Sequence, residues 1–241
     1  FFFLIRSFIN KNIFFIFQNK DDLSVFQKHK ILGKNKPKII KGSGVSTNEF
    51  VEGNEKKVYD LIFHSRVIRD KGIYEIIDAL KILRKKNINL KTLILGDPDN
   101  KNRSTITLDQ LNVWIKKNFI MWKPKVENVI PFLQKSKISI LPSYREGLPK
   151  GLLEAASCKL PLISTNVPGC REICKNNFNG FLVEPKDPES LATSIEKLIF
   201  NKTLIKKFGA NSRKLVQQKF STKIISKDFL VVYKEILKKD P

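Results

Sequence analysis

The chain has 241 residues, of which 41% are hydrophobic and 28% charged, and its formal net charge is +22. This length allows one large domain or two small ones, and the apolar content is ample for a packed core. Such a positive charge suits nucleic acid or an anionic membrane surface, but Lys outnumbers Arg 37 to 8 and is spread along every segment. Nucleic-acid readers concentrate Arg at specific contacts, so we expect no nucleic acid as a partner and keep the anionic membrane surface.

The N-terminal stretch indicates the downstream part of a longer protein, because Phe1 is not a plausible translation start and the sole methionine is Met121. Residues 1–17 are apolar but broken by polar side chains, whereas a membrane span needs about 20 consecutive apolar residues. They also lack the small-residue cleavage site of a signal peptide. We predict a helix end here, followed by a buried strand, a helix and a short strand at Ile13–Phe17, Asp21–Leu32 and Pro37–Ile40.

Further along the chain, short apolar runs alternate with segments of helical periodicity. The predicted strands are Tyr59–Phe63, Thr92–Leu95, Ile120–Trp122, Ile138–Leu141, Pro161–Thr165 and Phe181–Val183. The predicted helices are Gly72–Lys86, Thr107–Lys117, Val129–Leu133, Lys150–Cys158, Asp187–Phe200, Leu204–Lys219 and Ile224–Lys238. This alternation favours an α/β, Rossmann-like fold in which helices cover both faces of a parallel sheet. In the second helix we expect an apolar side made of Leu108, Leu111, Val113 and Ile115.

The segment Leu141–Glu172 holds two strand–loop–helix units in succession. Pro142 ends the first strand, and Pro149 stands at the first position of the next helix, where its missing N–H needs no partner. Two helix N-termini are therefore expected near one edge of the sheet. Their free N–H groups and positive dipole suit phosphate oxygens.

Two carboxylates of this segment, Glu146 in the loop and Glu154 on the helix, are eight positions apart. A glycosidase needs two carboxylates close to a single bond, but the spacing alone does not establish such closeness, and the apolar stretch between the two suggests that they have different partners. The simpler interpretation is that Glu146 caps the helix and that Glu154 is a solvated surface residue. From these residues alone, both interpretations stay open.

Arg66 and Lys71 follow the strand Tyr59–Phe63, at the carboxyl end where open α/β sheets bind ligands. In a chain so rich in Lys, the alternative is that both are ordinary solvated cations. His64, just before them, is expected to pack or to cap rather than to catalyse.

The three cysteines, Cys158, Cys170 and Cys174, have neither histidine near them in the sequence. A structural zinc site needs four ligands at a characteristic spacing, so we predict no metal site. We expect buried or reduced thiols, as in a reducing cytosol.

Several strings resemble the C-terminal domain of the retaining GT-B glycosyltransferases, and most closely family 4 (glycosyl transferases group 1), whose members build bacterial surface polysaccharides. These strings are PSYREGLPKGLLEA, PGCRE, NGFLVEPKDPESLA and the Arg-x4-Lys-Gly pattern at Arg66. The family's E-x7-E signature matches Glu146 and Glu154, and the resemblance runs with gaps from about Asn12 to Leu237. It implies that residues 46–241 form the C-terminal nucleotide-sugar-binding domain. Residues 1–45 would then be the tail end of the N-terminal acceptor domain and the interdomain linker.

The resemblance also implies a role for each matching residue. Arg66 and Lys71 would grip the donor diphosphate, and with Glu146, on the sugar side of the donor, they would form the catalytic set. Glu154 would hold the ribose hydroxyls. The remaining implied donor-binding residues are Gly44, Gly147, Leu148, Pro149 and Lys150. No metal and no cofactor are implied; the expected donor is a UDP-sugar, although the sequence leaves uridine or guanosine open.

The function implied is transfer of a sugar from a nucleotide-diphospho-sugar to a lipid-linked or saccharide acceptor, in surface polysaccharide biosynthesis. The alternative is an inactive remnant, or a split subunit whose N-terminal domain is supplied by another chain. We expect this chain alone to bind nucleotide sugar but to show little or no transfer, because half a cleft does not hold reactants in attack geometry. The expected location is the cytoplasm, peripheral on the inner face of the cell membrane.

Overall fold

The computed structural model describes residues 5, 7–10 and 13–238. Their main feature is a six-stranded sheet in which every pair of neighbours is parallel, with the strand order β5-β4-β3-β6-β7-β8. The strands are β3 (Tyr59–His64), β4 (Thr92–Leu95), β5 (Met121–Lys123), β6 (Ser136–Leu141), β7 (Leu162–Thr165) and β8 (Gly180–Val183). The predicted α/β fold with a parallel sheet is confirmed.

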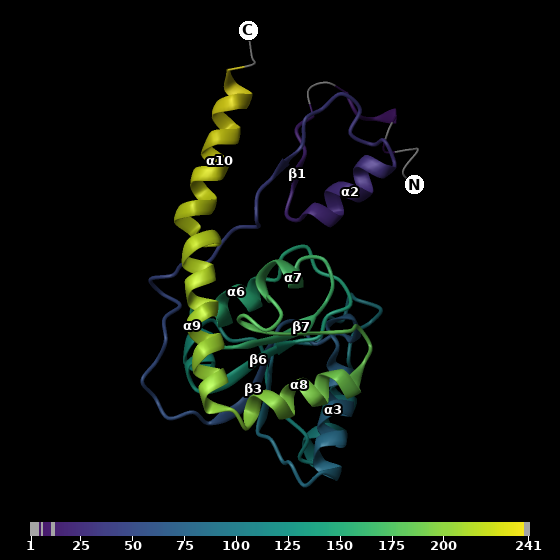
Figure 1. The fold of residues 1–241 in the computed structure, drawn as a ribbon. Coiled ribbons are helices and arrows are strands. Elements are labelled where there is room, and N and C mark those ends of the chain that lie inside the picture. The colour runs from purple at the N-terminus through teal and green to yellow at the C-terminus, as the bar shows by residue number, and fades with distance from the viewer. Residues whose placement is uncertain (1–4, 6, 11–12, 239–241) are drawn as a thin grey trace.

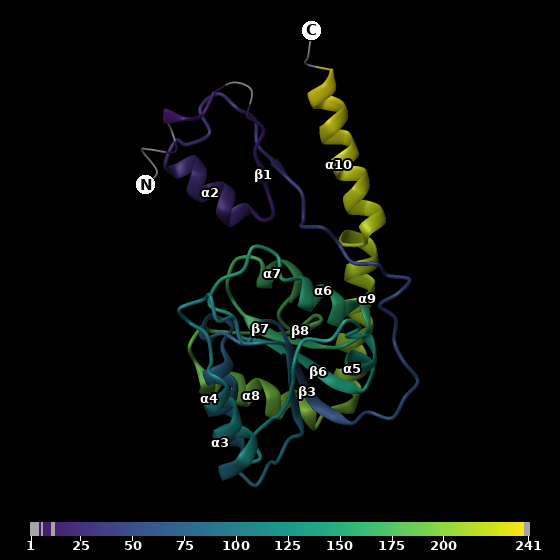
Figure 2. The same ribbon diagram turned by 180° about the vertical axis from the view of Figure 1, so that it is seen from behind.

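Helices cover both faces of this sheet (Figures 1 and 2). In Figure 1, α3 and α8 lie below the sheet, and α6 and α7 lie above it. The bounds are η1 (Arg69–Lys71), α3 (Ile73–Lys85), α4 (Leu108–Lys116), α5 (Ile130–Gln134), α6 (Lys150–Ser157), α7 (Cys170–Ile173), α8 (Pro188–Ile199), α9 (Lys202–Lys219) and α10 (Thr222–Leu237). Because both faces are covered, a strand such as β4, with the sequence Thr-Leu-Ile-Leu, is buried along its whole length.

The order of the strands creates a switch point between β3 and β6. From β3 the chain moves outward to β4 and β5, then returns to add β6, β7 and β8 on the other side of β3. This is the doubly wound arrangement, in which ligands bind at the carboxyl ends of the strands where the winding reverses. The loops that follow β3 and β6 therefore leave the sheet side by side.

A smaller unit precedes the main sheet. In it, β1 (Ile16–Phe17) pairs in parallel with β2 (Lys38–Ile39), and α2 (Lys20–Lys28) connects them. The long helix α10 extends away from the main sheet beside this unit (Figures 1 and 2), and Ile40 packs with its Ile225 and Val232.

Two predictions about these elements need correction. The expected buried strand Ile13–Phe17 forms strand pairs only at Ile16 and Phe17, and Ile16 is 38% exposed. Successive side chains of a strand point to opposite faces, and only Phe17 of this pair points into the aromatic contact with Phe26 on α2. The predicted helix end before it lies largely outside the described residues.

The apolar side predicted for α4 is also wrong in part. Leu111 is buried, but Leu108 and Val113 are 55% and 44% exposed, and Trp114 takes the inner position instead. Val113 lies about 200° around the helix from Leu111, so the two cannot share a face, whereas Trp114 follows Leu111 at a spacing of three.

Candidate functional site

The candidate site lies at the switch point. A cavity of about 680 Å³ opens there between the loops that follow β3, β4 and β5. A smaller hollow of about 270 Å³ adjoins it between the loops that follow β3 and β6. The two share His64, Ser65 and Glu154 in their walls. Most of the residues predicted for the site meet here: Arg66 lines the larger cavity, and Lys71, Glu146, Leu148, Pro149 and Lys150 line the smaller hollow.

Lys71 and Glu146 form an ion pair at the floor of the smaller hollow. Their side chains are only 14% and 11% exposed, and the Ser143 hydroxyl also donates to Glu146 Oε1, at 2.8 Å. Gly72 makes the approach possible: with φ of +79°, a Cβ there would lie 2.2 Å from the Pro142 carbonyl oxygen. The ion pair thus holds Lys71 against the loop that follows β6, although Lys71 and Glu146 are 75 residues apart in the sequence.

Glu146 does not cap α6. The N-cap position is Pro149, one residue before the helix, and no side chain makes a capping hydrogen bond there among the described residues. The interpretation of Glu146 as a helix cap is therefore wrong. The first turn of α6 instead presents Lys150 and Gly151 to the smaller hollow, as a helix N-terminus free to meet an anion would.

Glu154 lies at the junction of the two cavities and is not a solvated surface residue. Its side chain is 14% exposed; its carboxylate oxygens lie 3.4 Å from His64 Nε2 and 3.8 Å from Lys150 Nζ. The His64 side chain is 8% exposed, and its Nε2 has no hydrogen-bond partner among the described residues. Gly151 leaves room for His64, since a Cβ there would lie 2.8 Å from the His64 carbonyl oxygen and 3.1 Å from its Nε2. His64 packs, as predicted.

Arg66 differs from Lys71 in its surroundings. Its side chain is 59% exposed, and Nη1 lies 2.8 Å from Asp99 Oδ2 in the loop after β4. Arg66 and Lys71 also line a third hollow, of about 250 Å³. An exposed pair is held weakly and a buried one strongly, so Arg66 is the cation that exchanges its partner readily.

Gly44 is not brought to these cavities. With φ of +72°, it packs where α9 meets α10, and a Cβ there would lie 2.9 Å from the Phe220 carbonyl oxygen. Its neighbour Gly42 lies against the site instead, because a Cβ at that position would lie 2.8 Å from Leu148 Cδ2. The Gly-Ser-Gly string identifies this loop in the sequence, but it does not indicate which of the two glycines faces the site.

Three further residues were given no individual role from the sequence, although Gly169 lies in the PGCRE string and Asp99 in a Gly-Asp loop that resembles the family. Asp99 pairs with Arg66, and Asn19 donates from Nδ2 to the Gly147 carbonyl at 3.0 Å. Gly169 lies against the same loop: a Cβ on it would be 2.4 Å from the Gly147 carbonyl oxygen. Each acts across a long sequence separation. The sequence indicated the loops of Asp99 and Gly169 by resemblance, but it did not indicate the partner of any of the three residues.

The cysteines line neither of the two cavities. All three are buried and free, which confirms the prediction of buried thiols. Burial raises the pKa of the Cys158 thiol to about 12 and that of Cys170 to about 11, and it raises the pKa of Cys174 as well. Among residues 5, 7–10 and 13–238, no group of three or more His, Cys, Asp or Glu side chains is placed to hold a metal ion.

Comparison with known proteins identifies the family. Residues 45–215 match the model of the glycosyl transferases group 1 family, and the chain belongs to this family. It is 32% identical over 229 residues to the capsular polysaccharide biosynthesis glycosyltransferase CapM of Staphylococcus aureus, covering 88% of this chain and 60% of that protein.

Two other proteins are similar to this chain. The chain is 25% identical to the N,N'-diacetylbacillosaminyl-diphospho-undecaprenol alpha-1,3-N-acetylgalactosaminyltransferase of Campylobacter jejuni, over 93% of this chain and 61% of that protein. Its fold matches the crystal structure of Anabaena HepE in complex with UDP-glucose, with a TM-score of 0.78, 17% identity, and coverage of 91% of this chain and 63% of that one. The chain thus spans about three fifths of the length of the curated relatives it matches. In the described part of the chain, no helix has both the length and the apolar character needed to cross a bilayer.

Proposed function

We propose that this chain is the donor side of a retaining, family 4 glycosyltransferase and binds a nucleoside diphosphate sugar at the β3–β6 switch point. The observation that carries the proposal is the convergence of Lys71, Glu146 and Glu154 on two adjoining cavities, with Arg66 at the rim. Four charged side chains from three separate segments meet where doubly wound sheets bind ligands.

The chemistry to be assisted is departure of a diphosphate while positive charge develops on the sugar. Lys71, Arg66 and the N-terminus of α6 supply positive charge and N–H donors fixed before the reaction begins, which stabilises the leaving group electrostatically. Glu146 would meet sugar hydroxyls from the smaller hollow. Glu154, between the two cavities, would accept hydrogen bonds from the ribose. No residue of this scheme calls for a metal or a cofactor.

The nucleoside would occupy the larger cavity, whose volume of about 680 Å³ is in the range of small-molecule sites. Uridine is the proposed base, since the Anabaena neighbour was crystallised with UDP-glucose. The acceptor would be lipid-linked or a saccharide, as the names of the Campylobacter and Staphylococcus relatives suggest. A net charge of +22 would favour contact with the anionic inner face of the cell membrane. Residues 1–45 would belong to the acceptor-side domain and the linker, and residues 46–241 to the donor domain.

Calorimetric titration with UDP, GDP and uridine tests the proposal. Arg66→Ala removes a charge-assisted contact worth about 1.5–3 kcal/mol, which corresponds to a loss of roughly tenfold to a hundredfold in UDP affinity. Because Arg66 is 59% exposed, we expect the lower end. Uridine affinity should stay the same.

The matched control is Lys85→Ala, which removes an exposed cation from α3 away from the cavities. Equal UDP affinities for the two variants would mean that the phosphates bind elsewhere. Absence of UDP and GDP binding by the unmodified chain would refute the proposal itself. UDP binding without sugar transfer to a lipid-linked acceptor would support a donor-binding module instead of a complete enzyme.

A further inference from the structure

The loop that carries Glu146 is held from the N-terminal unit by one buried side chain. Asn19 is 1% exposed, and its Nδ2 donates to the Gly147 carbonyl at 3.0 Å across 128 residues of sequence. The same side chain caps α2: its Oδ1 accepts from the Asp22 backbone N–H at 2.8 Å, and its Nδ2 donates to Asp22 Oδ2 at 2.9 Å. One amide therefore joins the start of α2 to the β6–α6 loop.

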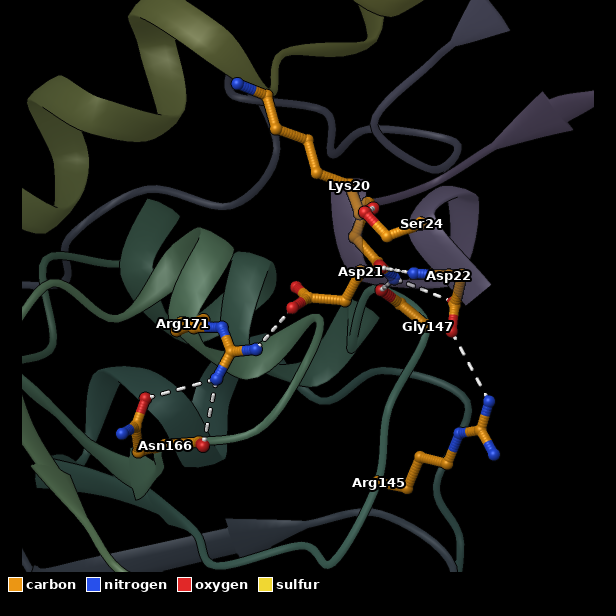
Figure 3. A network of polar contacts seen from close by, with 9 residues as sticks. Lys20, Asp21, Asp22, Ser24, Arg145, Gly147, Asn166 and Arg171 are labelled. Atoms are coloured by element: carbon orange, nitrogen blue, oxygen red, sulfur yellow. Dashed lines mark hydrogen bonds and ion pairs between the residues drawn. The ribbon is translucent and has the colours of Figure 1, made fainter. Parts of the chain in front are cut away.

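Two ion pairs flank this hydrogen bond (Figure 3). Asp21 Oδ1 lies 2.6 Å from Arg171 Nη2, and Asp22 Oδ1 lies 3.3 Å from Arg145 Nη2. Arg171 also donates to the Asn166 carbonyl at 3.1 Å, so the loop after β7 is part of the same network. Acidic residues in the first turn of α2 are favourable there in their own right, because they oppose the positive end of the helix dipole.

The backbone at Gly147 lies close to both the N-terminal unit and the β7–α7 loop. A Cβ at this position would lie 2.7 Å from Gln18 Oε1, next to Asn19. From the opposite direction, a Cβ on Gly169 would lie 2.6 Å from the Glu146 carbonyl oxygen. The close approach of Gly169 limits movement of the Gly147 backbone toward the β7–α7 loop, whereas the tip of Gln18 can rotate away, so on that side the Asn19 hydrogen bond holds the loop.

We propose that Asn19 is a positioning residue of the donor site: by holding the Gly147 carbonyl, it sets the position of the adjacent Glu146 against Lys71. The role assigned to Glu146 rests on the proposed function; the hold on the loop does not. A displacement of the N-terminal unit from the sheet would be transmitted to the donor loop through this amide and the flanking, exposed Asp22–Arg145 pair, so the segment before residue 45 would influence donor affinity without touching the donor.

Asn19→Ser separates this role from the folding of α2. Serine caps a helix about as well as asparagine, so the Asp22 backbone N–H keeps an acceptor, but the short side chain no longer donates to Gly147. The matched control is Asn35→Ser. Asn35 donates from Nδ2 to the Asn10 and Leu32 carbonyls, at 3.0 and 3.1 Å, within the N-terminal unit and not to the loop.

Hydrogen–deuterium exchange of peptides covering residues 143–149, without ligand, gives the first measurement. Loss of one intramolecular hydrogen bond, about 0.5–1.5 kcal/mol, should speed exchange of this loop about twofold to tenfold in Asn19→Ser. Asn35→Ser should leave it unchanged. UDP affinity, measured by calorimetry, should fall by a similar factor in Asn19→Ser only.

Each outcome has one meaning. Unchanged loop exchange in Asn19→Ser, or an equal change in Asn35→Ser, overturns the hold on the loop. Faster exchange with unaltered UDP affinity overturns the positioning role. If the unmodified chain binds neither UDP nor GDP, the proposed function and with it the positioning role fail, while the exchange measurement still decides whether Asn19 holds the loop.

Discussion

Replacement of Lys71 by alanine should destabilise the fold far more than replacement of any exposed lysine. The change leaves the Glu146 carboxylate, 11% exposed, with the Ser143 hydroxyl as its remaining hydrogen-bond partner among the described residues. Breaking a buried pair by removing one partner costs about 3–5 kcal/mol. Because the two side chains retain 14% and 11% exposure, water reaches them in part and we expect about 3 kcal/mol. That is a large share of the 5–15 kcal/mol that domains of this kind possess in total.

Urea unfolding followed by tryptophan fluorescence measures this loss, since Trp114 is 5% exposed in the folded chain and becomes solvated on unfolding. Lys85→Ala, on the exposed face of α3, should stay within about 0.5 kcal/mol of the unmodified chain. The double variant Lys71→Met with Glu146→Gln removes both charges and should recover most of the loss, because a neutral pair has no charge left to desolvate. If Lys71→Ala matched Lys85→Ala, the pair would not be buried in solution and the reasoning would be refuted.

Two further predictions concern the surroundings of the site. Gly151→Ala places a Cβ 2.8 Å from the His64 carbonyl oxygen and should lower the free energy of unfolding, measured in urea, by about 1–3 kcal/mol. Lys150→Ala, one residue earlier and exposed, should change this free energy little. Equal effects of the two substitutions would show that α6 moves to accommodate the Cβ without loss of stability. The buried thiols, with folded pKa values of about 12 for Cys158 and about 11 for Cys170, should resist a thiol reagent at pH 8 until urea unfolds the chain. These folded pKa values exceed the unfolded value of about 8.5, so above that pH the unfolded chain binds fewer protons than the folded chain. The thiols' contribution to the free energy of unfolding should therefore be fully present below about pH 8.5 and decline as the pH rises toward 11. A flat profile over this range would contradict the burial of the thiols.

The strands of the main sheet were predictable because a parallel strand buried on both faces is a continuous apolar run. Tyr59–Phe63 and Thr92–Leu95 were placed within one residue of their observed ends for this reason. The face of α4 was not predictable in the same way. Its sequence offers apolar residues on two sides, and only the position of the helix on the sheet selects Leu111 and Trp114.

For the site, the sequence indicated which loops matter but not which atoms meet. Arg66 and Lys71 are five residues apart on one loop, yet one is exposed beside Asp99 and the other is buried against Glu146. That difference arises from the neighbouring loops, since Gly96 and Gly72 approach Ser65 and Pro142 closely. Such long-range contacts leave no periodic pattern in the sequence, because they depend on which strands the topology places next to each other.

The two ion pairs also suggest how the proposed site would accommodate a diphosphate without losing its own structure. An exposed pair contributes about 0–1 kcal/mol, so Arg66 can leave Asp99 for a phosphate oxygen at small cost. Lys71 cannot leave Glu146 so easily, because its pair is buried. It does not need to, since an ammonium group has three N–H donors and can hold Glu146 with one while it offers another to the phosphate. On this argument Arg66 contributes mainly to binding and Lys71 to both binding and structure. For that reason the Arg66→Ala titration and the Lys71→Ala unfolding experiment measure different properties of the same site.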